Sequence, residues 1–417
     1  MKEKYSLRDF TQAPGLNIAQ RIDQFQLYTE QLKEQKHNSF HTLAFSGVNT
    51  HMIVEDPVTL QKREVVSFIS NDYLGMSQCP EVKEAGIKAV EQYGAGACAA
   101  PIIGGFMKLH RELEMRLAEF MGYEDAIIFS SGYGANAGAL GGIMGKKDMA
   151  LVDSFIHASA YDGLLQTNVK KVGHNDLEYL EMNLKRVQGD YDTVMLIADG
   201  VYSQNGDLGM LPEYIDLCRK YGAFIMVDDA HGIGVFGENG KGVTEYQGVL
   251  GKPDMVTGTL SKSFGCVGGF VASSRKMVDY LRFYGRTSVF SAAPTPQATA
   301  SALKSLDLIQ ERPEIRAGLW KNVHYMKSQL LANGFDIKET VSPIFPIMVR
   351  DNYLIKEIAK MLLERGFYTI GICYPAVSNN DSRIRTSVLA THTKEDIDGF
   401  VNALNEIDSI LHFKKQE

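Results

Sequence analysis

The chain has 417 residues, too many for one ordinary hydrophobic core, so its length predicts about two or three domains. Hydrophobic residues make up 45% and charged residues 22%, which is typical of a globular protein, and no apolar run reaches the roughly 20 residues needed to span a bilayer. A formal net charge of -7 and the lack of any run of Lys and Arg argue against nucleic acid as a partner.

Helical and strand patterns alternate along most of the chain. Helical spacing and a charged face predict an N-terminal helix over residues 18–36, and residues 37–63 have no regular pattern. A strand is predicted at VVSFIS (65–70). Further apolar strands are predicted at DAIIFS (125–130), MALVDS (149–154), TVMLIADG (193–200), AFIMVDD (223–229), DMVTGT (254–259) and GGFVASS (268–274).

Amphipathic segments such as LHRELEMRLAEFM and EYIDLCRKYG lie between these strands. Apolar strands alternating with helices are typical of βαβ units in a mainly parallel sheet, with active-site loops at the carboxyl ends of the strands. From about Glu314 the pattern changes, and the rest of the chain is predicted to form a smaller α+β domain that ends in a helix over TKEDIDGFVNALNEIDSILHF. We therefore expect an α/β fold with an N-terminal helix and arm (1–64), a large domain (65–312) and a small C-terminal domain (313–417).

The cysteines and the N-terminus indicate the compartment. Five scattered cysteines without a C-x-x-C pair suit reduced thiols better than disulfides or a structural zinc site. The polar segment MKEKYSLRDF lacks the apolar core of a signal peptide. We therefore expect a cytoplasmic protein.

The strongest local signal is a lysine in TGTLSKSFG (257–265), directly after a predicted strand. Glycines and small hydroxyl residues leave room around Lys262 for a bulky adduct, and the hydroxyls can hold a phosphate. An amine must be partly deprotonated to form an imine, so this loop suits a Schiff-base lysine. A surface lysine in a flexible loop is the alternative, whereas a P-loop is excluded because Ser261 rather than glycine precedes Lys262.

The segment VDDAHG (227–232) favours the imine interpretation. A carboxylate such as Asp228 at the end of a buried strand is costly unless it meets a cation, and a protonated pyridine nitrogen is one. His231 can hydrogen-bond a ring oxygen or carry protons. A metal site built from the same two residues lacks further ligands at fitting spacing, so no metal is expected.

Three further segments are candidates for the same pocket. SSGYG (130–134) opens a small-residue helix, and a helix N-terminus with free N–H groups suits a phosphate. His157 can stack on an aromatic ring, although a lone loop histidine more often lies on the polar surface. Ser203 can donate to a ring oxygen, although such a serine more often caps a helix or stabilises a turn. The G-x-G-x-x-A run at 94–99 follows a helical stretch, so a dinucleotide site is not supported, and no G-x-S-x-G elbow indicates a serine hydrolase.

Nine motifs, taken in order, closely resemble those of the α-oxoamine synthases. They are NDYLG, YGAGA, LHRELE, FSSGYGAN, DSFIHAS, DGVYSQNGD, VDDAHGIGVFG, GTLSKSFG and ATHTKEDI, and the likeness runs from about residue 65 to 410. This group includes serine palmitoyltransferase, 8-amino-7-oxononanoate synthase, glycine C-acetyltransferase and 5-aminolevulinate synthase. The resemblance implies the aspartate-aminotransferase fold (fold type I), pyridoxal 5'-phosphate (PLP) as cofactor, and a homodimer with shared active sites.

The resemblance also implies roles for individual residues. Lys262 would carry PLP as a Schiff base and remove the Cα proton of the amino acid, Asp228 would pair with the pyridine nitrogen, and His157 would stack on the ring. The implied contacts are His231 and Ser203 at the ring oxygen, Ser131, Gly132, Tyr133 and Thr259 at the phosphate, and Ser291 at the phosphate of the neighbouring subunit. Asn71 and Arg385 are the implied contacts of the amino-acid carboxylate, and a planar guanidinium suits a carboxylate better than an ammonium does. Arg383, which departs from the family pattern, is a further candidate for substrate binding.

The implied reaction is a decarboxylative condensation of an amino acid with an acyl thioester, which gives a 2-amino ketone. The stretches GGFVASS, SVFSAAPTP and RIRTSVLATHT look most like bacterial serine palmitoyltransferases, which favours a long acyl chain and a sphingoid-type product. Two departures concern the amino acid: Ala99-Ala100-Pro101 stands where most relatives have Gly-Ser-Arg, and Arg383 stands where those enzymes usually have an apolar residue. Serine, cysteate (which begins sulfonolipid synthesis), glycine and alanine are all candidates.

Two alternatives stay open. One is a short-chain α-oxoamine synthase such as glycine C-acetyltransferase or 8-amino-7-oxononanoate synthase. The other is a non-catalytic scaffold homologue, against which the joint presence of Lys262, Asp228 and His231 argues. The acyl group is expected to be a thioester of CoA or of acyl carrier protein. A lipid product would suit peripheral association of the enzyme with a membrane.

Overall fold

The computed structural model describes residues 7–10, 13–37 and 40–414 and divides into two compact units. Unit 1 comprises Met1–Ser70, Gln204–Gly206 and Leu319–Glu417, and unit 2 comprises Asn71–Ser203 and Asp207–Gly318. The sequence predicted three parts with boundaries after residues 64 and 312. The structural division instead groups the N-terminal residues with the C-terminal ones and changes unit after residues 70 and 318.

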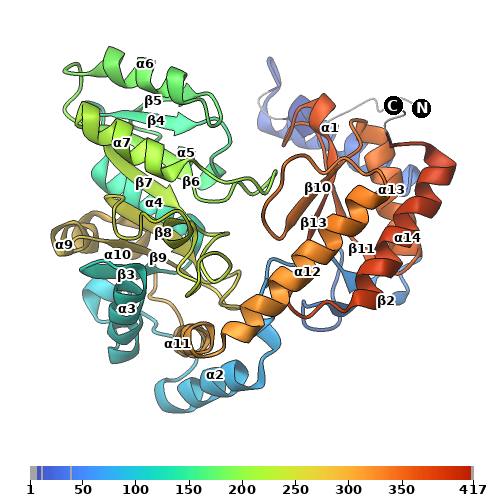
Figure 1. Cartoon of the computed structure of the whole chain (residues 1–417), viewed down its shortest axis with the longest axis horizontal. Coiled ribbons are helices and arrows are strands. Elements are labelled where there is room, and N and C mark those ends of the chain that lie inside the picture. The colour runs from blue at the N-terminus through green and yellow to red at the C-terminus, as the bar shows by residue number, and fades with distance from the viewer. Residues whose placement is uncertain (1–6, 11–12, 38–39, 415–417) are drawn as a thin grey trace. The chain divides into compact units, whose positions relative to one another are not determined.

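Unit 2 is built on a seven-stranded sheet with the strand order β3-β9-β8-β7-β6-β4-β5 (Figure 1). The strands are β3 (Asp125–Phe129), β4 (Met149–Asp153), β5 (Asn168–Val172), β6 (Val194–Asp199), β7 (Phe224–Asp228), β8 (Met255–Thr259) and β9 (Gly269–Ser273). Strands β4 to β8 pair in parallel, whereas β9 runs antiparallel to β3 and β8. Several strands are buried along their whole length, which explains their continuous apolar sequences. The predicted α/β fold with a mainly parallel sheet is confirmed.

In the described residues before the predicted C-terminal α+β domain, two strands have no counterpart among the predicted ones. Strand β5, with the sequence NVKKV, is a largely exposed edge strand. Strand β1 (His51–Glu55) alternates between exposed and buried positions and lies within residues 37–63. The prediction that residues 37–63 lack regular structure is therefore wrong, because the apolar run of β1 is only three residues long (Met52 to Val54) and too short to stand out.

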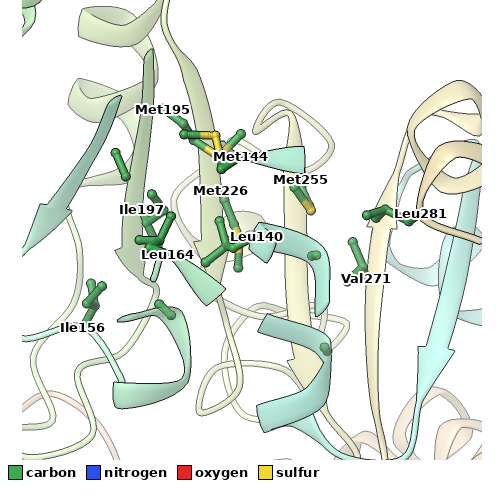
Figure 2. Packing of buried hydrophobic residues seen from close by; sticks show 14 of the residues in the cluster. Leu140, Met144, Ile156, Leu164, Met195, Ile197, Met226, Met255, Val271 and Leu281 are labelled. Carbon is green, nitrogen blue, oxygen red and sulfur yellow. The ribbon is translucent and has the colours of Figure 1, made fainter. Parts of the chain in front are cut away.

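The helices of unit 2 pack on and around its sheet. They are α2 (Pro80–Tyr93), α3 (Lys108–Met121), α4 (Gly132–Ile143), α5 (Ala158–Gly163), α6 (Leu177–Val187), α7 (Leu211–Tyr221), α8 (Val243–Tyr246), α9 (Arg275–Tyr284), α10 (Arg286–Val289) and α11 (Pro296–Glu311). Figure 2 shows Leu140 of α4 packed among Ile197, Met226 and Met255 of the strands. The helix is rich in Gly and Ala, so its backbone approaches the sheet closely.

The close approach is tightest at the first residue of α4. A Cβ atom on Gly132 would lie 2.8 Å from the Thr259 Cβ, so a larger residue would push the helix away from the strand. The N-terminus of α4 therefore lies beside the carboxyl end of β8.

Unit 1 contains two three-stranded sheets with orders β1-β2-β11 and β10-β13-β12. Its remaining strands are β2 (Lys62–Ser67), β10 (Ile344–Met348), β11 (Phe367–Tyr368), β12 (Ile370–Ile372) and β13 (Arg383–Ser387). Its helices are α1 (Ile18–Glu34), α13 (Asn352–Glu364), α14 (Lys394–Leu411) and the part of α12 (Pro313–Ala332) from Leu319 onward. Short 3-10 helices occur in both units: η1 (Leu7–Phe10) and η4 (Asn379–Asp381) belong to unit 1, and η2 (Met76–Gln78) and η3 (Pro101–Ile103) belong to unit 2. Helices α1 and α14 confirm the two terminal helices predicted from the sequence.

In the parts of the chain that the structure describes, every helix is too short or too polar to cross a membrane.

Candidate active site

The carboxyl ends of β6, β7 and β8 meet at one edge of the unit 2 sheet. The strand register places Asp199 beside Asp228, and Asp228 beside Thr257. A cavity of about 240 Å³ opens at this edge. The sequence-predicted residues that line it are Ser131, Gly132, Tyr133, His157, Ser203, Asp228, His231, Thr259 and Lys262, and they are joined by Asn136, Ser159, Asp199, Val201, Ala230, Thr257, Gly258 and Ser261.

Asp228 is held by hydrogen bonds on both carboxylate oxygens. Its Oδ2 accepts from Asn136 Nδ2 at 2.6 Å, and its Oδ1 accepts from the Ala230 backbone N–H at 3.0 Å. Asn136 in turn accepts from Thr257 Oγ1 at 2.7 Å and donates to Ser159 Oγ at 2.9 Å. A carboxylate has about four acceptor positions, so Asp228 keeps capacity for a cationic donor. The sequence did not predict a role for Asn136, whose only signal is an amide among small residues in a helix.

Two neighbouring aspartates have strongly raised pKa values. Burial raises the pKa of Asp199 well above its ordinary value, the charge of Asp228 raises it further, and Lys262 opposes the rise. Burial likewise raises the pKa of Asp229, although its Oδ2 accepts from the Val243 backbone N–H at 2.8 Å. The local field therefore opposes additional negative charge beside Asp228.

His157 presents an uncharged imidazole to the cavity. It caps α5, where its Nδ1 accepts from the Ser159 backbone N–H at 3.3 Å and lies 2.7 Å from Ser159 Oγ. Burial lowers the pKa of His157; Asp228 acts to raise it, and Lys262 acts to lower it. A neutral ring whose Nδ1 is used by the helix cap can offer its flat face to a planar ligand.

His231 is oriented by a tyrosine that the sequence did not single out. Nδ1 of His231 lies 2.7 Å from the hydroxyl of Tyr73, which also lies 3.3 Å from Asn71 Oδ1. Tyr73 is 0% exposed. The hydroxyl has one proton and two neighbouring acceptors, Asn71 Oδ1 and His231 Nδ1. When it donates to His231 Nδ1, the ring proton lies on Nε2, available to an acceptor in the cavity. Tyr73 lies in the motif NDYLG, and its role depends on a histidine 158 residues away.

The N-terminus of α4 and the loop after β8 form a corner suited to a phosphate. Ser131 caps α4, and its Oγ accepts from the Gly134 backbone N–H at 2.9 Å. Thr259 Oγ1 and Ser261 Oγ lie 2.7 Å apart beside it. Hydroxyl groups next to the positive end of a helix dipole favour an anion.

Two residues predicted at the phosphate have other contacts as well. The Tyr133 hydroxyl donates to Asp162, and its ring stands edge-on to His157 with ring centroids 6.3 Å apart. Ser291 lies outside the set of residues that line the cavity, and its Oγ is 3.5 Å from Ser130 Oγ of the same chain. The contact of Ser291 with a neighbouring subunit stays a prediction.

Arg383 holds the loop that follows Ser203. Its Nη1 donates to the Gln204 carbonyl at 3.1 Å and to Asn205 Oδ1, and its Nε donates to the Asp381 carbonyl at 2.7 Å. Its Nη2 lies 3.4 Å from Asp381 Oδ1. These contacts all lie within unit 1, to which Gln204–Gly206 belongs. They give Arg383 a positioning role, and its predicted contact with the substrate stays a prediction.

Asp207, which follows Gly206 and belongs to unit 2, pairs with His174. His174 Nε2 lies 2.6 Å from Asp207 Oδ2, and its Nδ1 lies 3.0 Å from Asp153 Oδ1. Burial acts to lower the pKa of His174, but the two carboxylates outweigh it and raise the pKa to about 9. At neutral pH His174 is therefore protonated and pairs with both aspartates.

The predicted carboxylate contacts Arg385 and Asn71 belong to unit 1 and unit 2, respectively. Arg385 is 8% exposed, and its Nη1 donates to Ser387 Oγ at 3.1 Å. It lies on the same face of β13 as Arg383, because residues i and i+2 of a strand point the same way. Their joint contact with a substrate carboxylate stays a prediction.

The Ala99-Ala100-Pro101 departure concerns a different cavity of unit 2. Pro101 begins η3 and, with Phe106, Arg282 and Phe283, contributes to the lining of a cavity of about 370 Å³. The cavity that contains Lys262 is lined by other residues. The effect of this departure on the choice of amino acid stays a prediction.

The residues at the β6–β8 edge fit PLP by their chemistry. Lys262 offers an amine for the aldehyde, and Asp228 offers a fixed carboxylate for the protonated ring nitrogen. His157 offers a flat neutral ring, and the corner at Ser131 and Thr259 offers donors for the phosphate. These groups all line one cavity.

Comparison with known proteins gives the same assignment. Residues 63–404 match the family model for aminotransferase class I and II. Serine palmitoyltransferase from Sphingobacterium spiritivorum is 37% identical over 402 residues, which cover 94% of this chain and 99% of that protein. 8-Amino-7-oxononanoate synthase from Thermoanaerobacter pseudethanolicus is 40% identical over 352 residues, which cover 84% of this chain and 89% of that protein. The solved serine palmitoyltransferase from S. paucimobilis with a bound PLP–myriocin aldimine matches with a TM-score of 0.90 at 30% identity, covering 95% of this chain and 100% of that one.

These relatives and the donor set of the cavity agree on the chemistry. PLP is the cofactor, and the protein is a PLP-dependent C-acyltransferase. The chain belongs to the aminotransferase class I and II family and, within it, to the α-oxoamine synthases.

Proposed function

We propose that this α-oxoamine synthase condenses serine with a long-chain fatty acyl thioester, releases CO2 and gives a 2-amino ketone of the 3-ketosphinganine type. The observation that carries this proposal is the match to a solved serine palmitoyltransferase, with a TM-score of 0.90 over 95% of the chain. The sequence stretches around Ser291 and Arg385, which resemble bacterial serine palmitoyltransferases, support the same choice.

The residues of unit 2 would prepare the amino acid for reaction. When bound, PLP supplies a protonated ring that withdraws electrons from the Cα of the amino acid. Lys262 would hold the cofactor and, once displaced by the amino acid, accept the Cα proton at its Nζ. Asp228, fixed by Asn136, would keep a proton at the ring nitrogen. His157 would cover the ring face and exclude water.

The remaining groups would guide formation of the carbon–carbon bond. Arg385 would pair with the substrate carboxylate until it leaves as CO2. His231 would donate from Nε2 to an oxygen that gains negative charge, with Tyr73 holding Nδ1. The new bond joins Cα to the acyl carbonyl carbon, and the thiolate leaves and takes up a proton.

We further propose a cytoplasmic homodimer. Ile103, Phe283 and Phe290 are 76%, 67% and 75% exposed, and large apolar side chains with this exposure support an interaction surface. Phe290 precedes Ser291, the residue that the family resemblance assigns to the neighbouring subunit. The five cysteines are all free, which supports a reducing compartment. A long-chain product would draw the enzyme to a membrane surface, where acyl-CoA or acyl carrier protein would deliver the chain.

A short-chain reaction is the second candidate. The 40% identity to 8-amino-7-oxononanoate synthase from Thermoanaerobacter pseudethanolicus favours it. In that case the enzyme would use glycine or alanine with a shorter acyl thioester.

Turnover by the purified PLP enzyme separates these proposals. Serine, cysteate, glycine and alanine would each be combined with acetyl-CoA, pimeloyl-CoA (seven carbons) and palmitoyl-CoA, and CO2 and the 2-amino ketone would be measured by mass spectrometry. We expect the fastest turnover with serine and palmitoyl-CoA, and none with Lys262→Ala. Turnover restricted to short acyl thioesters with glycine or alanine would refute the long-chain proposal, and a folded protein inactive with every pair would support the scaffold alternative.

A further inference from the structure

A second, separate cavity lies in unit 1 and has an excess of positive charge. Its volume is about 230 Å³, and its lining comes from the end of α1, the segment before β2, helix α13 and the β11–β12 junction. The charged residues that line it, apart from His37, are Lys36, Arg63, Lys356, Lys360, Asp56 and Glu364. Basic side chains therefore outnumber acidic ones.

One of the two acidic lining residues is already satisfied by the protein. Asp56 Oδ1 accepts from the backbone N–H groups of Val58 and Thr59 at 2.9 and 3.0 Å, and its Oδ2 pairs with Arg63 Nη2 at 2.9 Å. Burial acts to raise the pKa of Asp56, but these hydrogen bonds outweigh burial and lower it. Asp56 therefore orients Arg63 and is not a free negative charge facing the cavity.

A nearby glutamate is similarly engaged. Glu357 pairs with His37 Nε2 at 2.6 Å and with Lys360 Nζ at 3.4 Å. Lys356, the residue before Glu357 on α13, is 9% exposed, and its Nζ lies over the Tyr28 ring, 5.8 Å from the centroid. Lys356 therefore lines the cavity from a buried position, and the Glu357 carboxylate is engaged by His37 and Lys360.

Two lining residues carry buried polar atoms that lack a hydrogen-bond partner. Thr369 is 3% exposed, and its Oγ1 is unpartnered. Arg63 Nε is also unpartnered, although its Nη1 donates to the Glu364 carbonyl at 3.2 Å. A buried donor without an acceptor is unfavourable, and most such groups in native proteins have a partner. A hydroxyl and a guanidinium N–H can both donate to an acceptor in the cavity, and the excess of basic side chains around them favours an acceptor of negative charge.

We propose that this cavity binds a small phosphate-type oxyanion. A phosphate has three strong acceptor oxygens, which match a hydroxyl, a guanidinium N–H and the lysine ammonium groups. The volume lies below the range of about 300–1,000 Å³ that is usual for drug-sized ligands, so the ligand is compact. Bound anion would join Lys36, Arg63 and Thr369 and so tie three segments of unit 1 together. This site lies in unit 1, whereas the phosphate corner at Ser131 lies in unit 2, and the proposal is independent of which substrates the enzyme uses.

Thermal unfolding of the PLP-loaded enzyme tests the proposal. Loading with PLP occupies the phosphate corner of unit 2, so added inorganic phosphate reports on other sites. Phosphate would be titrated against sodium chloride at constant ionic strength, and an apparent Kd obtained from the rise in Tm. Lys36→Gln and Thr369→Val remove one charge and one hydroxyl. Lys33→Gln, an exposed position on α1 outside the cavity lining, is the matched control.

We expect a saturable rise in Tm, an apparent Kd at least threefold weaker in Lys36→Gln and in Thr369→Val, and no change in Lys33→Gln. For each variant, the rise in Tm is measured relative to the Tm of the same variant in sodium chloride. A lower stability of Thr369→Val therefore does not hide a change in phosphate affinity. Equal phosphate responses in all four proteins, or no saturable rise above chloride, would overturn the proposal. A parallel titration with glycerol phosphate identifies the source: tighter binding of this ester indicates a phosphorylated metabolite, and equal or weaker binding indicates free phosphate.

Discussion

Replacing Asn136 with alanine tests whether the Asp228 carboxylate depends on its amide partner. The substitution removes the 2.6 Å hydrogen bond to Asp228 and leaves the buried Thr257 hydroxyl without its acceptor. A hydrogen bond to a charged group contributes about 1.5–3 kcal/mol, and an unsatisfied buried hydroxyl costs about 1–3 kcal/mol. If the charged hydrogen bond fixes Asp228 for the ring nitrogen, its loss weakens PLP binding by about 10- to 150-fold.

The assay separates cofactor binding from folding. Apoenzyme would be titrated with PLP and followed by absorbance, and the stability of the same apoenzyme would be measured by thermal unfolding. Asn183→Ala is a matched control: Asn183 is 2% exposed, and its Nδ2 donates to the Tyr179 carbonyl of its own helix at 2.7 Å. We expect Asn183→Ala to lower stability and leave PLP affinity unchanged. A folded Asn136→Ala protein that binds PLP within about twofold of the parent would refute this role, since one charged hydrogen bond predicts a larger loss.

Other substitutions address the remaining groups. Tyr73→Phe removes the hydroxyl at His231 Nδ1 and should lower kcat by about 10- to 100-fold with little change in PLP affinity; an unchanged kcat would show that Tyr73 does not control this histidine. Arg383→Met should lower the free energy of unfolding by about 2–4 kcal/mol in urea titrations, whereas unchanged stability with a raised KM for the amino acid would identify a substrate ligand. The two carboxylates raise the pKa of His174 to about 9 in the folded protein. Its ion pairs therefore contribute fully to stability at pH values below the pKa of the unfolded state. This contribution, up to about 3 kcal/mol, is lost as pH rises through about 9. Urea midpoints should therefore fall between pH ~7 and ~10 in the parent and less in His174→Gln; an equal fall in both would contradict the assignment.

The sheet of unit 2 was predictable because its buried strands are short apolar runs that end in polar residues. The runs DAIIF, MALVD and MVTGT are buried along their whole length, so periodicity and burial give the same signal. Strand β1 escaped prediction because its apolar run is only three residues long, and β5 because it is an exposed edge strand with polar residues at most positions. Their pairing depends on neighbouring strands, and that information is not local.

Within the site, the residues at strand ends were predictable, and those that orient them were not. Asp228 and Lys262 follow apolar strands and carry chemistry in their own side chains. Asn136 and Tyr73 act through partners that are 92 and 158 residues away, respectively, so no local pattern marks them. Arg383 was predicted near the substrate because it departs from the pattern of the resembling family, but its contact with Asn205 spans 178 residues and appears only in the fold.

The contacts of Arg383 bear directly on which amino acid the enzyme uses. An extra arginine beside Arg385 could serve a second acidic group on the substrate, and this is why cysteate was a candidate. In the structure Arg383 is 2% exposed, and each of its guanidinium nitrogens already has a partner in the loop Gln204–Gly206 or at Asp381. A sulfonate would have to displace those hydrogen bonds and would itself lose hydration, whereas the neutral hydroxyl of serine needs no second cation. The positioning role of Arg383 therefore favours serine over cysteate, and faster turnover of cysteate than of serine would contradict this reasoning.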